Sequence, residues 1–283
     1  MFNIQPLKTE TQTPRRKRRL KITNFLSLPY LLILLILIVI PIVLILFYSM
    51  TVKVNDLYYQ FSLKYFIDFF TEGTFVRTMG DSIVLAIITT VICLFIGYPT
   101  AWIIARQKPR TQQILILLVT APMWINMLIR TLAWKQIFDM IDPNILGSNL
   151  AIITGMVYVF LPFMILPIYT VLSKIDPLLY EASHDLGASD FKTFTKVTLP
   201  LSIGGILSGI TMVLLPAATT IVIPKILGTG RYMIGTLIEE RFLKAGNWGY
   251  GSAIAIILAV IIMVMVLLSR RFDKSREVES DDY

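Results

Sequence analysis

The chain has 283 residues, of which 55% are hydrophobic and 16% are charged, and its mean hydropathy is +0.72. A soluble domain of ordinary composition does not need so many apolar residues, so this balance excludes a soluble globule and predicts an integral membrane protein. The net charge of +8 does not by itself indicate nucleic-acid binding, because basic runs beside membrane spans more often anchor the chain against anionic lipid headgroups; we expect no nucleic-acid partner.

The first 26 residues are polar and basic, and we interpret them as a cytoplasmic tail. Their basic cluster, Arg15 to Arg19, precedes an apolar segment that begins near Leu31. This segment continues past the usual length of a signal-peptide core and has no small-residue cleavage site before Tyr48. We therefore expect an uncleaved first membrane span.

Six segments are long and apolar enough to cross a membrane. A hydrocarbon core about 30 Å thick needs roughly 20 helical residues, and the segments are residues 29–48, 81–105, 112–132, 148–171, 201–223 and 251–269. They are too long and too continuously apolar for strands of a membrane barrel. We predict an all-α membrane protein with a six-helix domain over residues 27–271 and a cytoplasmic tail over residues 272–283.

Residues 51–80, between the first two spans, mix aromatic and charged side chains. Aromatic rings tend to lie at the membrane interface. We predict an amphipathic helix that lies in the outer interface over this stretch.

Polar residues inside a span usually face the protein interior or a wet cavity. Seven residues are candidates for a substrate path: Trp124, Asn126, Arg130, Tyr158, Tyr169, Thr219 and Thr220. Asn126 and Arg130 are four residues apart and would share one helix face, whereas Trp124 would not. The spans contain no clear acid at depth.

Residues 172–200 carry charged side chains between two apolar segments, so they cannot lie in hydrocarbon and must fold at the membrane face. The stretch contains Glu181-Ala182-Ser183, then Gly187, then Val197-Thr198-Leu199-Pro200. Gly187 permits a positive φ, and Pro200 can begin a helix. When this stretch and both termini are placed in the cytoplasm, most of the 26 Lys and Arg residues lie on that side, as the positive-inside rule requires.

The spacing in this stretch resembles the coupling loop of the permease subunits of ATP-binding-cassette (ABC) importers. Their pattern is Glu-Ala-Ala, three residues, Gly, nine residues and an aliphatic-x-Leu-Pro end, and only Ser183 departs from it. The segment Gly97-Tyr98-Pro99-Thr100-Ala101-Trp102 also resembles a segment of these permeases. Residues 122–130, 161–169 and 181–189 look most like the B-type permease of spermidine/putrescine importers.

The resemblance implies a type I ABC importer permease in the bacterial inner (plasma) membrane that is not itself an enzyme. It implies three partners: a second permease subunit, an extracytoplasmic solute-binding protein, and an ABC ATPase dimer that would hold ATP and Mg²⁺, so this chain would bind no cofactor. It assigns ATPase contacts to nine residues of the coupling loop: Glu181, Ala182, Ser183, Asp185, Gly187, Ala188, Phe191, Leu199 and Pro200. We expect no metal site, because His184 is the only histidine and Cys93 the only cysteine.

The resemblance favours a polyamine substrate. Ammonium groups are held by carboxylates and aromatic faces, so the missing deep acid would come from the second permease, or specificity would rest with the binding protein. The alternatives are a permease for iron, thiosulfate, phosphonate or another small solute, and an autonomous secondary transporter. An autonomous transporter would need no ATPase-docking loop, and a membrane enzyme is disfavoured because no catalytic cluster or phosphate-binding Gly-rich loop is present.

Overall fold

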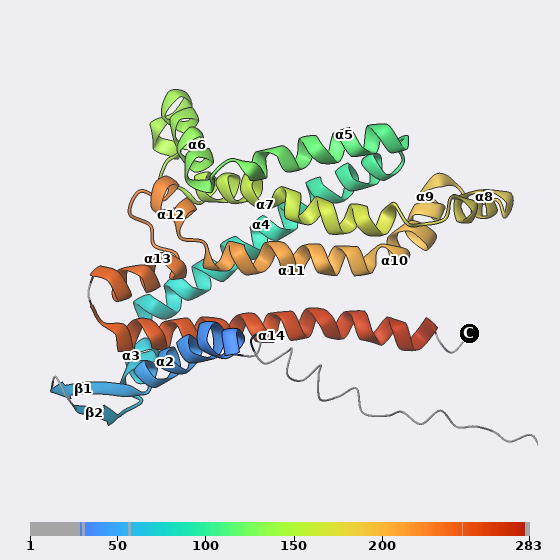
Figure 1. The fold of residues 1–283 in the computed structure, drawn as a ribbon. Coiled ribbons are helices and arrows are strands. Elements are labelled where there is room, and N and C mark those ends of the chain that lie inside the picture. The colour runs from blue at the N-terminus through green and yellow to red at the C-terminus, as the bar shows by residue number, and fades with distance from the viewer. Residues whose placement is uncertain (1–28, 30–31, 56–57, 245, 281–283) are drawn as a thin grey trace, which may run out of the picture. The chain divides into compact units, whose positions relative to one another are not determined.

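The computed structural model describes residues 29, 32–55, 58–244 and 246–280, and most of this part of the chain is helical (Figure 1). Contacts divide the chain into two units, residues 1–45 and residues 46–283. The predicted tail, residues 1–26, lies outside the described residues. A π-helical turn, Leu35–Val39, leads into α2, Ile40–Ser49, and the apolar stretch Leu32–Ser49 is long enough to span a membrane.

The larger unit begins at Leu46, in the last part of α2, and a β-hairpin then forms where the sequence predicts an amphipathic helix. Strands β1, Thr51–Asn55, and β2, Tyr58–Phe61, pair antiparallel with Thr51 opposite Phe61. β-branched and aromatic side chains favour an extended backbone, and in this stretch they outweigh the helical pattern. Helix forms only in the second half of the predicted region, as α3, Lys64–Thr71, and as the first turns of α4.

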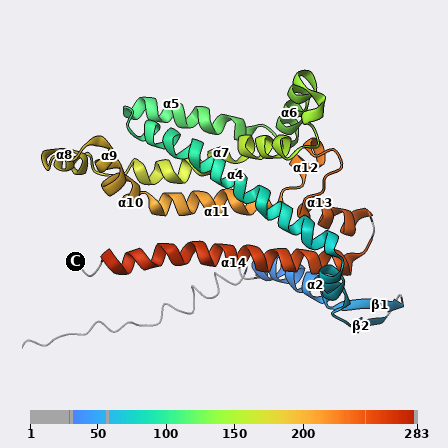
Figure 2. The same ribbon diagram turned by 180° about the vertical axis from the view of Figure 1, so that it is seen from behind.

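Three long helices form the centre of the larger unit: α4, Gly73–Ala105, α7, Asn149–Leu172, and α11, Ile203–Thr219. Figure 2 shows α4 crossing α7 and α11, and all three pairs of helices are in contact. Gly205 lets α11 approach α7 closely, because a Cβ there would lie 3.0 Å from the carbonyl oxygen of Pro167. Close backbone approach at small residues is typical of helix contacts in membranes.

Further elements flank these three helices. They are α5, Pro109–Thr120, the 3-10 turn Ala121–Trp124, α6, Met127–Ile141, the 3-10 turn Pro143–Ile145, α12, Val222–Leu227, α13, Ile234–Glu239, the π turn Glu240–Lys244 and α14, Trp248–Ser280. Helix α14 runs beside α11 (Figures 1 and 2). It continues to Ser280, so most of the predicted C-terminal tail is part of this helix.

The third predicted span, residues 112–132, is not one helix. The chain bends by 90° between Pro109–Trp124 and α6. Pro122 lies in the 3-10 turn, Ile125 is extended, and the Asn126 side chain restarts the helix by accepting a hydrogen bond from the Leu128 N–H at 2.8 Å. A capping residue lies outside the helical backbone, so Asn126 and Arg130 do not share a helix face as predicted.

The fifth predicted span, residues 201–223, is also interrupted. A 62° bend separates Asp190–Leu201 from α11, and α11 ends at Thr219 because Thr220 is extended. Among the described residues, four helices could cross a membrane alone, and up to six spans result if each bent pair counts as one. The prolines at 99, 162, 167 and 216 lie within continuing helices, as spans tolerate when neighbouring groups satisfy the freed carbonyls.

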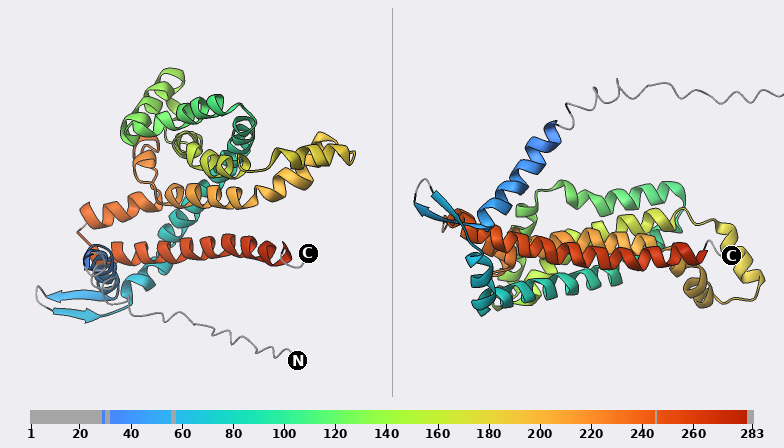
Figure 3. Two further views of the ribbon diagram at one scale, coloured as in Figure 1. Left: turned by 45° about the vertical axis from the view of Figure 1, so that its right-hand side comes forward. Right: turned by 90° about the horizontal axis from the view of Figure 1, so that it is seen from below.

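The coupling loop lies at one end of the larger unit. Its elements are α8, Pro177–Asp185, α9, Asp190–Thr193, the π turn Phe194–Thr198 and α10, Leu199–Leu201. All views show α8 and α9 projecting beyond the other helices, with α6, α12 and the hairpin at the opposite end (Figure 3).

Candidate functional site: the coupling loop

Helix α8 begins with strong local signals. The Asp176 carboxylate accepts a hydrogen bond from the Leu178 N–H at 2.9 Å, and Pro177 occupies the first turn. A capping carboxylate satisfies an otherwise unpaired N–H, and proline at the first helical position costs no hydrogen bond. The helix therefore starts at a defined residue, directly after α7 leaves the bundle.

The turn after α8 is a Schellman motif centred on Gly187. The Gly187 N–H donates to the His184 carbonyl at 2.8 Å, and the Ala188 N–H donates to the Ser183 carbonyl at 3.0 Å. Gly187 has φ +75°, and a Cβ there would meet no atom of the described residues within 4 Å. Glycine is therefore needed for its backbone conformation and not for space.

Ser183, the one departure from the Glu-Ala-Ala pattern, joins the two helices of the loop. Its hydroxyl donates to the Tyr180 carbonyl at 2.8 Å and lies 2.8 Å from the Thr193 hydroxyl, which is left as the donor to Ser183. Thr193 is buried. The serine thus holds α8 against α9, where an alanine would leave the buried Thr193 hydroxyl without this partner.

His184 lies across the same turn. Its Nδ1 is 3.2 Å from the Ala188 carbonyl oxygen, and its Nε2 is 3.5 Å from a carboxylate oxygen of Asp190. The ring thus spans the end of α8 and the start of α9. Among the described residues no group of three His, Cys, Asp or Glu side chains is placed to hold a metal ion.

The outer surface of the loop exposes large apolar side chains. Leu186 is 88% exposed and Phe191 is 76% exposed, on either side of the Gly187 turn. Of the nine predicted contact residues, six are exposed and three are partly buried: exposed are Glu181, Ala182, Asp185, Gly187, Phe191 and Pro200, and partly buried are Ser183, Ala188 and Leu199. Leu186 is not among the nine predicted residues, although an apolar residue within a charged stretch was a visible signal of such a contact. That these residues contact an ATPase stays a prediction.

One face of α4 packs against the second half of the coupling loop, the arm that leads into α11. Tyr98 and Trp102, four residues apart, both place their rings edge-on to Phe194, with centroids 5.8 and 6.2 Å away. The Tyr98 hydroxyl lies 2.9 Å from that of Ser202, at the bend before α11. The two sequence motifs therefore meet in space, one on α4 and the other in the loop.

Arg106 extends this face of α4 by one more turn. Its guanidinium carbon lies 4.1 Å from the centroid of the Trp102 ring and 5.3 Å from that of Tyr180 on α8. A cavity of about 620 Å³ opens beside it, lined by residues of the α4–α5 turn, the end of α7 and α8. Cation and rings are close enough for cation–π attraction, which acts within about 6 Å of a ring centroid.

Gln112 connects three elements by hydrogen bonds at the same end of the bundle: α5, the α4–α5 turn and α7. Its side-chain amide donates to the carbonyls of Ala105 and Gln107 at 2.9 and 2.8 Å, and its oxygen accepts from the Tyr169 hydroxyl at 3.1 Å. Tyr169, predicted to line a substrate path, therefore joins α7 to the α4–α5 turn near the coupling loop.

The other six candidates for the substrate path are spread over separate places. Trp124 is 73% exposed and Asn126 caps α6. Arg130 is 9% exposed, and its Nε and Nη1 have no hydrogen-bond partner among the described residues. Tyr158 on α7 packs its ring edge-on to Trp134 at 5.7 Å. Thr219 and Thr220 lie at the end of α11. The structure does not bring the seven predicted residues into one site.

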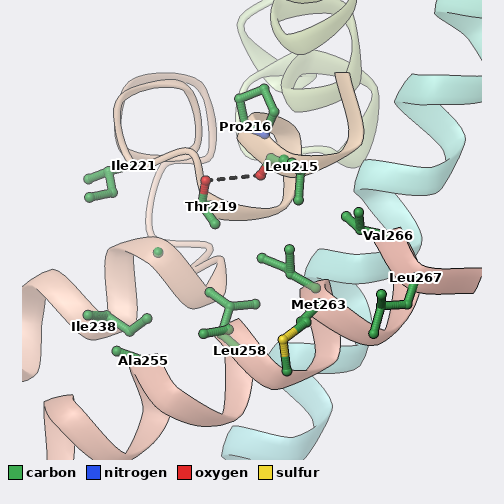
Figure 4. Close-up of a pocket in the computed structure, with 13 residues that line it drawn as sticks. Leu215, Pro216, Thr219, Ile221, Ile238, Ala255, Leu258, Met263, Val266 and Leu267 are labelled. Carbon is green, nitrogen blue, oxygen red and sulfur yellow. Dashed lines mark hydrogen bonds between the residues drawn. The ribbon is translucent and has the colours of Figure 1, made fainter. Parts of the chain in front are cut away.

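Thr219 lines an apolar groove of about 850 Å³ between α11, α13 and α14 (Figure 4). Its hydroxyl donates to the Leu215 carbonyl at 3.0 Å. The rest of the lining is apolar and includes Leu258 and Met263 of α14 and Ile238 of α13. The described residues that line this groove include no carboxylate and no aromatic ring, so the groove does not suit a cation.

A bundle of apolar spans with a folded loop that exposes apolar side chains at one end is the architecture of a membrane transport permease. Residues 87–278 match the family model of the binding-protein-dependent transport system inner membrane component. The chain belongs to this family.

Named relatives and solved structures agree with this assignment. The chain is 36% identical to the spermidine/putrescine transport system permease protein PotB of Haemophilus influenzae, over 72% of this chain and 78% of that protein. It is 32% identical to PotB of Escherichia coli K12, over 74% and 83% of the two chains. A bacterial alginate ABC transporter, in complex with an alginate pentasaccharide-bound periplasmic protein, matches with TM-score 0.72 and 17% identity over 90% and 94%.

These matches confirm the predicted family and the type I permease fold. They also confirm a multi-pass protein of the inner membrane.

Proposed function

We propose that this chain is a permease subunit of an ATP-driven ABC importer for polyamines such as spermidine and putrescine. Its coupling loop docks on a dimer of ABC ATPases, and its spans form the translocation path together with a second permease. The observation that carries the ATPase contact is the pair of exposed apolar residues, Leu186 and Phe191, on a turn that is rigidly closed around Gly187.

The geometry of the loop supports this docking. Exposed aromatic and aliphatic side chains on a rigid element are typical anchors of a protein interface. Ser183 and His184 bridge the turn with hydrogen bonds, so little conformational freedom is lost on binding. The partner ATPase would hold ATP and Mg²⁺, and this chain would hold no cofactor and catalyse no reaction.

Orientation follows from the same assignment. If α8 and α9 contact a cytoplasmic ATPase, both termini are cytoplasmic, and the hairpin, α6 and α12 face the opposite side. A solute-binding protein would deliver the substrate at that opposite face. The positive-inside distribution of Lys and Arg supports this orientation.

Polyamine as the substrate is supported by the relatives at 36% and 32% identity, which are named spermidine/putrescine permeases. Polyamines need carboxylates and aromatic faces. Asp81 lies about two turns into α4, so carboxylates deeper in the path would come from the second permease, unless specificity rests with the binding protein. Iron, thiosulfate and phosphonate remain the alternative substrates, and an autonomous secondary transporter is the alternative mechanism.

The experiment is purification of a tagged chain followed by reconstitution with the ATPase, second permease and binding protein that accompany it. We expect ATP hydrolysis to rise with spermidine or putrescine, and not with thiosulfate, a phosphonate or ferric iron. Stimulation by one of these other solutes alone would overturn the polyamine assignment. Solute flux through the chain without any ATPase would overturn the importer mechanism.

A further inference from the structure

We propose that Arg106 is a positioning residue that ties the coupling loop to span α4, so that movement of α8 reaches α4 as well as α7 and α11. The proposal rests on the ATPase-driven mechanism proposed above. It assigns a role to a residue that the coupling-loop pattern, residues 172–200, does not contain.

Chain connectivity explains why such a tie is needed. The coupling loop is covalently continuous with α7 at one end and with α11 at the other. Helix α4 ends at Ala105 and leads into α5, so it has no covalent link to the loop. Any displacement of the loop must reach α4 through side chains.

The guanidinium of Arg106 makes this contact with α8. Its central carbon lies over the Trp102 ring, 4.1 Å from the ring centroid, and 5.3 Å from the centroid of the Tyr180 ring on α8. Arginine is suited to this position because a planar guanidinium stacks on aromatic faces and stays charged at any physiological pH. The order Tyr180, Arg106, Trp102 thus joins a loop helix to a span.

The surroundings make this contact specific. Helix α8 otherwise contacts mainly α9, and the cavity of about 620 Å³ separates it from the α4–α5 turn. Across this cavity the link between α8 and α4 is made by side chains that reach over it, and Arg106 contributes the cation of that link. Arg106 is itself exposed, so its replacement leaves no unpaired buried charge and should leave the bundle folded.

A second contact lies further along the loop, where Phe194 sits against Tyr98 and Trp102. Trp102 therefore touches both arms of the loop, through Arg106 on the α8 side and directly on the Phe194 side. Two contacts on one helix can transmit a rotation as well as a shift. Removing the Arg106 contact would leave the contact at Phe194, on the arm that leads to α11.

The test uses the full complex with ATPase, second permease and binding protein in liposomes, and measures solute taken up per ATP hydrolysed. Arg106→Gln should lower this ratio by at least about fivefold, the lower end of typical coupling between sites, with the ATPase still bound. Tyr180→Leu should do the same, Tyr180→Phe should behave as wild type, and the double variant should be no worse than either single one. The control is Arg110→Gln, which removes the same charge from the nearby start of α5.

A wild-type ratio in Arg106→Gln would overturn the proposal, as would loss of the ATPase from that variant, since Arg106 would then serve docking. The stack can also be tested without any partner. In the purified chain, the effects of Arg106→Gln and Tyr180→Leu on the midpoint of thermal unfolding should be non-additive, because contacting residues are coupled. Additive effects would contradict the contact between Arg106 and Tyr180 and so overturn the proposal. Failure of the wild-type chain to retain an ATPase would overturn only the proposed function.

Discussion

The hydroxyl of Tyr98 lies 2.9 Å from the hydroxyl of Ser202, which joins the middle of the α4 motif to the bend where the coupling loop enters α11. Ser202 also donates to the Leu199 carbonyl at 3.0 Å, so Tyr98 is left as the donor of the pair. Both residues are buried. The contact fixes the end of the loop against the bundle at a point 104 positions away in the sequence.

Tyr98→Phe should destabilise the protein slightly while leaving its packing intact. The ring contact with Phe194 is kept, and only one hydrogen bond is lost, which is worth about 1 kcal/mol. The expected measurement is a small drop in the midpoint of thermal unfolding in detergent. Tyr98→Ala, which also removes the ring, should cost several times more; equal effects of the two variants would show that the hydroxyl pair, and not the ring, carries the contact.

Gly187→Val should disrupt the turn between α8 and α9. A β-branched residue at φ +75° is strongly disfavoured, at a cost of at least about 1–2 kcal/mol. We expect the variant to reach the membrane but to lose its ATPase in co-purification. Gly187→Asn is the matched control, because asparagine tolerates the left-handed conformation, and it should retain the ATPase.

Phe191→Asp should abolish ATPase binding without unfolding the chain. The side chain is 76% exposed, so folding gains little from it, whereas an interface anchor is worth about 2 kcal/mol or more, roughly 30-fold in affinity. The control is Phe70→Asp on α3, which is 67% exposed at the opposite end of the unit. Equal ATPase binding by wild type and Phe191→Asp would contradict the docking role.

Neighbouring glycines on α11 should respond in opposite ways to alanine. At Gly205 a Cβ would lie 3.0 Å from the Pro167 carbonyl oxygen and 3.1 Å from the Ile168 Cα, and these are backbone atoms that cannot rotate away. Gly205→Ala should cost about 1–3 kcal/mol of unfolding free energy, as overpacking does. A Cβ at Gly204 would have no atom within 4 Å in the part of the chain that the structure describes, so Gly204→Ala should be neutral or stabilising. The midpoints of thermal unfolding of the two variants make the comparison.

Features that depend on neighbours along the chain were predictable. The span over 148–171 was expected and α7 forms over Asn149–Leu172, because an apolar run of this length has few alternatives in a membrane protein. The turn at Gly187 was expected for a similar local reason, since glycine adopts a positive φ without strain.

The breaks within spans were not predicted. Hydropathy is insensitive to backbone direction, so the apolar run over 112–132 gave no sign of the 90° bend at Ile125. Pro122 and the capping residue Asn126 were visible signals. These two signals did not lead to a predicted break, because proline by itself is common within continuous membrane helices, as Pro99 and Pro162 demonstrate here.

Short-range sequence patterns of hydropathy, glycine and proline therefore determine the family, the number of apolar segments and the position of the coupling loop. The meeting of Tyr98 with Ser202 and of Arg106 with Tyr180, and the scattering of the seven candidate path residues, arise only when the helices pack. No periodicity in the sequence indicates such pairs, because the chain between the two residues crosses the bundle before it returns. Folding alone sets which of those distant side chains come within reach of one another.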